Sequence, residues 1–67
     1  MIYSIPALTF DNEFTDLAFV GNYVDSLIPI DPEYATVYQW NGDEMKGPPD
    51  VVLRRVGSTW EKSSPVQ

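Results

Sequence analysis

The sequence predicts an all-β protein, a small antiparallel sheet or barrel built from consecutive β-hairpins, with at most one short helix near 13–20. Its 67 residues are enough for one domain only. Short strand-like segments are separated by the turn dipeptides Gly21-Asn22, Asn41-Gly42 and Gly57-Ser58, a pattern typical of small sheets and barrels. The segments on either side of Gly57-Ser58 also offer cross-strand pairs between chemically compatible side chains. We therefore expect one β-rich domain over 1–62.

The first ten residues are almost all apolar and predict a strand. Ile2, Tyr3 and Ile5 favour extended backbone. Pro6 has no N–H to donate to a ladder, so the strand is expected at a sheet edge or with a bend. Two interpretations of 1–10 remain: a strand buried on both sides within the domain, or an arm that packs onto another chain.

The next stretch, from 13 to 30, allows two structures. One is a short helix with Asp11 or Asn12 as its N-cap. The other is a hairpin with strands near 16–20 and 23–28 and Gly21-Asn22 as its turn. The aromatic and β-branched residues of this stretch favour the hairpin.

Asn41-Gly42 is the strongest short hairpin signal in the chain, because both central residues of a type I′ turn need positive φ. A two-residue turn there would pair Trp40 with Asp43. Alternation along the strand would then place Tyr38 and Trp40 on the core face and Val37 on the face in contact with water.

The segment 51–63 predicts a second hairpin, because Gly57-Ser58 suits a type II′ turn with glycine first. Two of the implied pairs support this register: opposite charges face each other in one, and a cation lies beside an aromatic ring in the other. The implied pairs are Val56–Thr59, Arg55–Trp60, Arg54–Glu61 and Leu53–Lys62. After Lys62, residues 63–67 have nothing to pack against, and we expect a flexible tail.

Charge is unevenly distributed along the chain. The net charge is −6, and the residues from Met1 to Met45 include eight acids and no Lys or Arg, whereas all four bases follow. Direct binding to nucleic acid is not expected, because phosphate contacts need clustered bases. The N-terminus lacks the basic stretch of a secretory signal, and no apolar run approaches the ~20 residues of a membrane span. We expect a soluble protein made in the cytoplasm and incorporated into a larger particle.

Composition disfavours catalysis. The chain has no Cys and no His, so disulfides, the usual nitrogen and sulfur metal ligands and the usual nucleophile–base pairs are all missing. The remaining carboxylates are expected to be solvated surface groups, because acid–base chemistry needs a cleft that shifts a pKa. We expect no catalytic residue, no bound metal and no cofactor.

The function expected is therefore a structural one: a small accessory subunit that docks on a larger complex, such as a viral or phage particle, or that associates with copies of itself. The alternative is an acidic inhibitor that mimics nucleic acid and blocks a basic site on an enzyme. Both need a protein partner, and neither needs a membrane. Partner contacts are expected from the apolar N-terminal segment, the first acidic cluster and the two arginines: Ile2, Tyr3, Ile5, Leu8, Asp11, Glu13, Asp16, Arg54 and Arg55.

Overall fold

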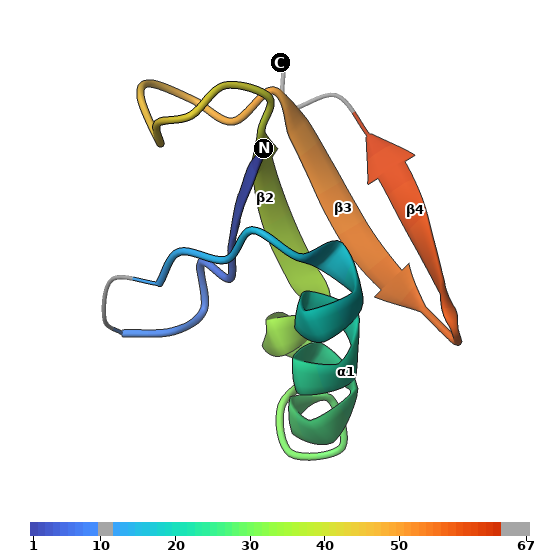
Figure 1. Ribbon diagram of the computed structural model, residues 1–67. Helices are drawn as coiled ribbons and strands as arrows, with labels where there is room; N and C mark the ends of the chain where they lie inside the picture. Colours follow the sequence, from blue (N-terminus) through green and yellow to red (C-terminus); the bar gives the residue numbers. More distant parts are fainter. Residues whose placement is uncertain (10–11, 64–67) are drawn as a thin grey trace.

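A four-stranded antiparallel sheet and one α-helix make up the fold of the computed structural model, which describes residues 1–9 and 12–63 (Figure 1). The strands follow the order β1-β2-β3-β4, and helix α1 lies against one face of the sheet (Figure 1). The elements are β1 (Ile2–Ser4), α1 (Leu17–Leu27), a 3-10 turn η1 (Pro32–Ala35), β2 (Thr36–Trp40), β3 (Val51–Val56) and β4 (Thr59–Ser63). The fold is thus a small α+β sheet rather than all-β, and the sheet is open rather than closed into a barrel.

The predicted hairpin over 16–20 and 23–28 is wrong, because this stretch forms α1. Asp16 is the N-cap, and its Oδ1 accepts a hydrogen bond of 3.0 Å from the backbone N–H of Ala18. Val20 and Val24, four residues apart, share the buried side of the helix. The Gly21-Asn22 pair lies inside the helix instead of forming a turn. The N-cap at Asp16 and the burial of one side of the helix therefore outweighed the strand propensity of the aromatic and β-branched residues in this stretch.

The hairpin predicted at Asn41-Gly42 is also wrong. Neither residue has a positive φ, so the type I′ turn does not form. Residues 41–50 instead form a loop. At its base, the backbone N–H of Asp50 donates a hydrogen bond of 2.8 Å to the backbone carbonyl oxygen of Gln39. Strand β2 pairs with β1 and with β3, and Val37 opposes Leu53. As a result Val37, expected on the wet face, is fully buried.

The hairpin of β3 and β4 is confirmed, including its four predicted cross-strand pairs. Gly57 has φ +61°, and positive φ is absent at Ser58, which fits a type II′ turn. Ser63, placed in the predicted tail, is the last residue of β4. The rest of that tail, 64–67, lies outside the described residues.

The core lies between α1 and the sheet. Its members are the apolar side chains that alternation points toward the helix, together with the buried side of α1. They are Tyr3, Ile5, Val20, Val24, Val37 and Leu53. On the opposite face of the sheet, Trp40 is buried, and its Nε1 donates to the Gly47 carbonyl oxygen of the 41–50 loop over 3.1 Å. Within the described ranges, no helix is long and apolar enough to cross a membrane.

The N-terminal segment is built into the domain. Tyr3 and Phe14 exchange two backbone hydrogen bonds of 2.8 and 2.9 Å, so the segment before α1 runs beside β1. The side chain of Asn12 holds the chain just after β1. Its Oδ1 accepts from the N–H of Ile5 over 2.6 Å and from Ser4 Oγ over 3.0 Å, and its Nδ2 donates to the Ile5 carbonyl oxygen over 3.2 Å.

Candidate functional site

Three aromatic rings gather beside α1, and we call Phe14, Phe19 and Tyr23 the aromatic patch. Phe14 lies 5.8 Å from Phe19 and 6.0 Å from Tyr23 between ring centroids, and Phe19 stacks on Tyr23 at 6.3 Å. Phe19 is 55% exposed although it is one of the largest apolar side chains of the chain. Phe14 and Tyr23 are half-buried against the core, so Phe19 is the exposed ring of the patch. Exposed apolar side chains that gather with others mark surfaces that bind other molecules.

Local structure explains why the rings meet. Phe19 and Tyr23 are four residues apart on α1, a spacing that places them on one side of the helix. Phe14 precedes the helix and is held in position by its backbone pairing with Tyr3. The patch is therefore preorganised on secondary structure rather than carried by a loop.

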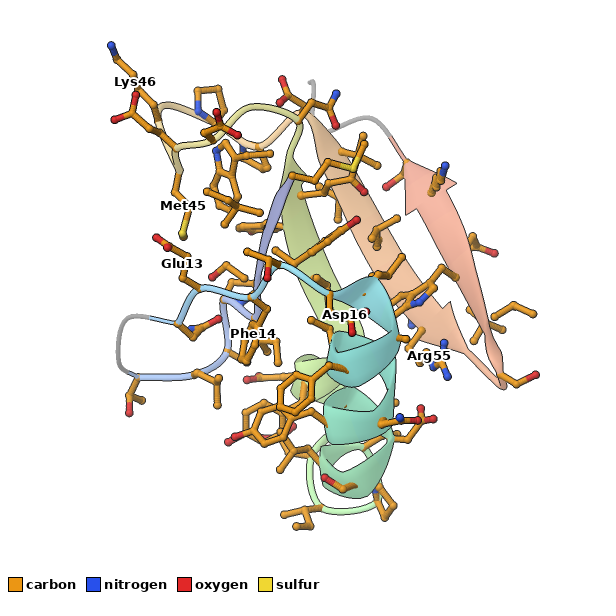
Figure 2. The ribbon with its side chains drawn as sticks, viewed as in Figure 1. Glu13, Phe14, Asp16, Met45, Lys46 and Arg55 are labelled. Atoms are coloured by element: carbon orange, nitrogen blue, oxygen red, sulfur yellow. The ribbon has the colours of Figure 1, made fainter. Side chains whose placement is uncertain are left out.

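Two predicted partner contacts, both acidic, are exposed in the segment that leads into α1. Glu13 and Asp16 flank Phe14 in the sequence, and both were predicted as partner contacts. Figure 2 shows Phe14 to the left of α1, with Glu13 above it and Asp16 at the start of the helix. Asp11, predicted with them, lies outside the described residues.

Arg55 has a structural role within the domain. Its Nε and Nη2 donate hydrogen bonds of 2.9 and 3.0 Å to the two carboxylate oxygens of Asp25, and its guanidinium lies 4.8 Å from the centre of the Trp60 ring. The hydrogen bonds lower the pKa of Asp25 and raise the pKa of Arg55. The predicted neighbour Trp60 is confirmed. The ion pair with Asp25 ties the hairpin to α1, so this predicted contact residue is already engaged.

A groove of about 380 Å³ opens between α1 and the β3–β4 hairpin, and Arg55 lies in its wall. Figure 2 shows this arginine on the side of α1 away from Phe14. The other lining residues are Leu17, Ala18, Gly21, Asn22, Ser58 and Trp60. Because Asp25 already neutralises the guanidinium, the groove has little charge to offer a ligand.

Arg54 lies on the opposite face of the sheet, which carries no helix in the described part of the chain. It is exposed and faces Glu61 across the β3–β4 ladder, as predicted. Alternation along β3 places Val52 and Val56 on the same face, and Val56 is 48% exposed. We call Val52, Arg54 and Val56 the β3 surface.

The predicted contact residues of the N-terminal segment are placed differently. Ile2, Tyr3 and Ile5 are buried within the domain, and Leu8 is half-buried against the core. This is the first of the two interpretations of 1–10, a strand covered by its own domain. In this conformation the three buried side chains do not form an outer surface.

Comparison of the chain with models of known families, with curated proteins and with solved structures found no match. The function therefore has to be inferred from the chain's own surface. Across 1–9 and 12–63, no three acidic side chains gather closely enough to hold a metal ion.

Phe19 and Tyr23 were not predicted from the sequence as contact residues. The signal was present as two aromatic residues four apart, but this spacing has meaning only on a helix, and the hairpin prediction for 16–28 concealed it. Glu13 and Asp16 were predicted as contact residues from their charge alone, and they stay predictions.

Proposed function

We propose that this protein is a non-catalytic docking subunit, which joins a larger assembly through the aromatic patch. The observation that carries this proposal is the exposure of Phe19, whose ring stacks on Tyr23 and lies 5.8 Å from that of Phe14. Fully burying a Phe side chain contributes about 1.5–3 kcal/mol, and the isolated domain, in which Phe19 is 55% exposed, forgoes part of that. A partner that covers the patch would recover that free energy.

The chemistry of the patch indicates the chemistry of the partner. Aromatic residues dominate the contacts that contribute most to protein interfaces. The carboxylates of Glu13 and Asp16 favour a partner surface that places Arg or Lys beside apolar side chains. A guanidinium can stack on a ring of the patch and pair with a carboxylate at the same time.

A matched pair of substitutions tests the proposal. Phe19→Ser removes the centre of the patch, and Ile30→Ser removes an apolar side chain that is 77% exposed but lies outside the three stacked rings. Both variants are expected to keep the fold, because neither side chain is in the core. Proteins captured from the native host by the wild-type chain should be lost with Phe19→Ser and kept with Ile30→Ser, and the purified pair should show the same difference by calorimetry. Equal capture by both variants would refute the proposal.

The acidic inhibitor remains the second candidate, and one observation favours it. Apart from Asp25, the carboxylates of the described residues make no ion pair with the chain's own bases. A nucleic-acid mimic would bind a basic protein with steep salt dependence and would tolerate Phe19→Ser. Capture that disappears at high salt but survives this substitution would favour inhibition over docking.

A further inference from the structure

We propose that Asn41 is a site of spontaneous deamidation, at which the chain converts its own Asn41-Gly42 linkage into aspartate or isoaspartate. This dipeptide predicted a tight turn, but neither residue has the positive φ that the turn needs. It lies instead at the start of the 41–50 loop, which projects beyond the upper end of the sheet, whereas α1 lies lower (Figure 1). The reaction neither uses nor requires the aromatic patch, so it is independent of the docking function.

The reaction needs only water as its co-reactant. The backbone nitrogen of Gly42 attacks Cγ of Asn41, a bond forms between these two atoms, and the bond from Cγ to Nδ2 breaks. Nδ2 leaves as ammonia, which takes up the proton of the Gly42 N–H, and a succinimide ring remains. Water then opens the ring and returns a proton to the nitrogen. Opening at Cγ gives aspartate, and opening at the backbone carbonyl carbon gives isoaspartate. Because the reacting groups are neighbours in the chain, proximity favours the first step.

The nitrogen that attacks is unhindered. Gly42 is exposed, and no described residue accepts a hydrogen bond from its backbone N–H. Gly42 carries no side chain, and even a Cβ added to it would meet no atom within 4 Å. Glycine also has the widest choice of backbone conformations. The nitrogen can therefore lose its proton to water and turn toward the side chain of Asn41.

The side-chain amide that is attacked is oriented by Gln39. Nε2 of Gln39 donates a hydrogen bond of 2.7 Å to Oδ1 of Asn41, and Gln39 is only 7% exposed. A donor in this position stabilises the negative charge that the carbonyl oxygen gains during the attack. Among the described residues none is bonded to Nδ2 of Asn41, which is an exposed residue. The buried amide thus holds the oxygen and leaves the departing nitrogen unrestrained.

The other two asparagines of the chain do not meet these conditions. Asn22 lies inside α1, and Asn12 is fixed by its hydrogen bonds to the backbone of Ile5. Each is followed by a residue with a large side chain, which hinders the approach of the backbone nitrogen. We therefore expect the reaction at Asn41 alone.

Both products alter the base of the loop. Each adds one negative charge close to Asp50, whose Oδ2 accepts the backbone N–H of Asn41 over 2.8 Å. Isoaspartate also lengthens the backbone directly after Trp40, which the loop holds through the hydrogen bond to Gly47. The added charge makes the products separable by ion exchange, and the altered backbone distinguishes isoaspartate from aspartate by mass-spectrometric fragmentation.

Ageing the purified chain tests the proposal. The folded wild type and Gly42→Ala are kept at physiological temperature for several weeks in buffers from neutral to mildly alkaline pH, and Asn41→Asp serves as the chromatographic standard for one product. Peptide mapping of the wild type should show aspartate and isoaspartate at position 41, formed faster as pH rises because the Gly42 nitrogen must lose its proton. Gly42→Ala should slow the reaction about tenfold or more, since its methyl group hinders the attack.

The wild type unfolded in guanidinium chloride gives the reference rate, because none of the loop's restraints remain there. The folded chain should deamidate within about tenfold of this rate. A folded chain that is slower than that shows that the loop protects Asn41 and overturns the proposal. So does a Gly42→Ala chain that reacts as fast as the wild type, or deamidation that occurs first at Asn12 or Asn22. Circular dichroism confirms that the wild type and Gly42→Ala stay folded during the incubation.

Discussion

The guanidinium of Arg55 packs directly on Gly21, in the middle of α1. A Cβ at Gly21 would lie 3.3 Å from Cζ and from Nη1 of this arginine, which is closer than most carbon contacts allow. Glycine inside a helix normally costs about 1 kcal/mol relative to alanine. Its presence here makes room for the side chain that joins the hairpin to the helix.

We expect Gly21→Ala to show this coupling in a double-mutant cycle. In an Arg55→Ala background, the substitution should stabilise the domain by about 1 kcal/mol, as helix propensity predicts. With Arg55 present most of that gain should be lost, because the guanidinium has to move. Urea unfolding measures all four chains. Ser26→Ala, at an exposed position of the helix that does not line this groove, should give the same change in both backgrounds. Equal gains at position 21 would contradict the coupling.

The ion pair of Asp25 and Arg55 should make stability depend on pH. Hydrogen bonding to Arg55 lowers the pKa of Asp25 in the folded state. A lowered folded pKa contributes stability above the unfolded value of ~3.9, and this contribution is lost as pH falls toward the folded value. The urea midpoint of the wild type should therefore exceed that of Asp25→Asn at about pH 6, and the difference should shrink below about pH 4. A difference that stays constant down to about pH 3 would show that the pair has no such role.

Gly57→Val should destabilise the β3–β4 hairpin by about 1–2 kcal/mol, because a side chain at positive φ approaches the backbone. Gly57 has φ +61°, and a Cβ added to it would meet no atom within 4 Å, so the cost is conformational rather than a clash. Gly42 has equally open surroundings without the positive φ, which makes Gly42→Ala a suitable control. Thermal unfolding should show a loss for Gly57→Val and almost no change for the control. Similar midpoints for both variants would argue against the turn.

Asn12→Ala should be the most damaging of these substitutions, with a loss of about 1–3 kcal/mol. The side chain of Asn12 satisfies the N–H and the carbonyl oxygen of Ile5, where the chain leaves β1. Truncation leaves both groups unpaired next to the core. Asn12→Asp keeps the acceptor and loses the donor, so its urea midpoint should fall between those of the wild type and the alanine variant. An alanine variant as stable as the wild type would show that water replaces these bonds without cost.

Prediction from the sequence succeeded where structure is decided locally. In the β3–β4 hairpin, turn chemistry and facing side chains such as Arg55 and Trp60 lie within a few residues of each other, so the sequence contains the whole pattern. For β2 the strand was recognisable, but its partner was not. Asn41-Gly42 suggested an immediate reversal, whereas the apolar residues able to pair with Val37 begin only at Val51.

The helix was harder to predict because its formation depends on tertiary structure. Residues such as Phe19, Val20 and Val24 have high strand propensity. The helix is favoured because Val20 and Val24, four residues apart, can then both pack against the sheet. The same dependence hid the aromatic patch. The rings could not be recognised as a group, since Phe14 and Tyr23 become neighbours only after α1 has formed.

The pairing of Phe14 with Tyr3 has a consequence for how the protein behaves at high concentration. An edge strand with unpaired backbone groups is a template on which further strands can add, and a protein with two such edges can stack into fibres. Here the outer edge of β1 is paired at Tyr3 with the backbone of Phe14. Strand addition is thereby discouraged at β1, so within the described residues β4 is the strand left at an open edge of the sheet. Disrupting the segment before α1 should accordingly expose a second edge strand and promote amyloid-like aggregation.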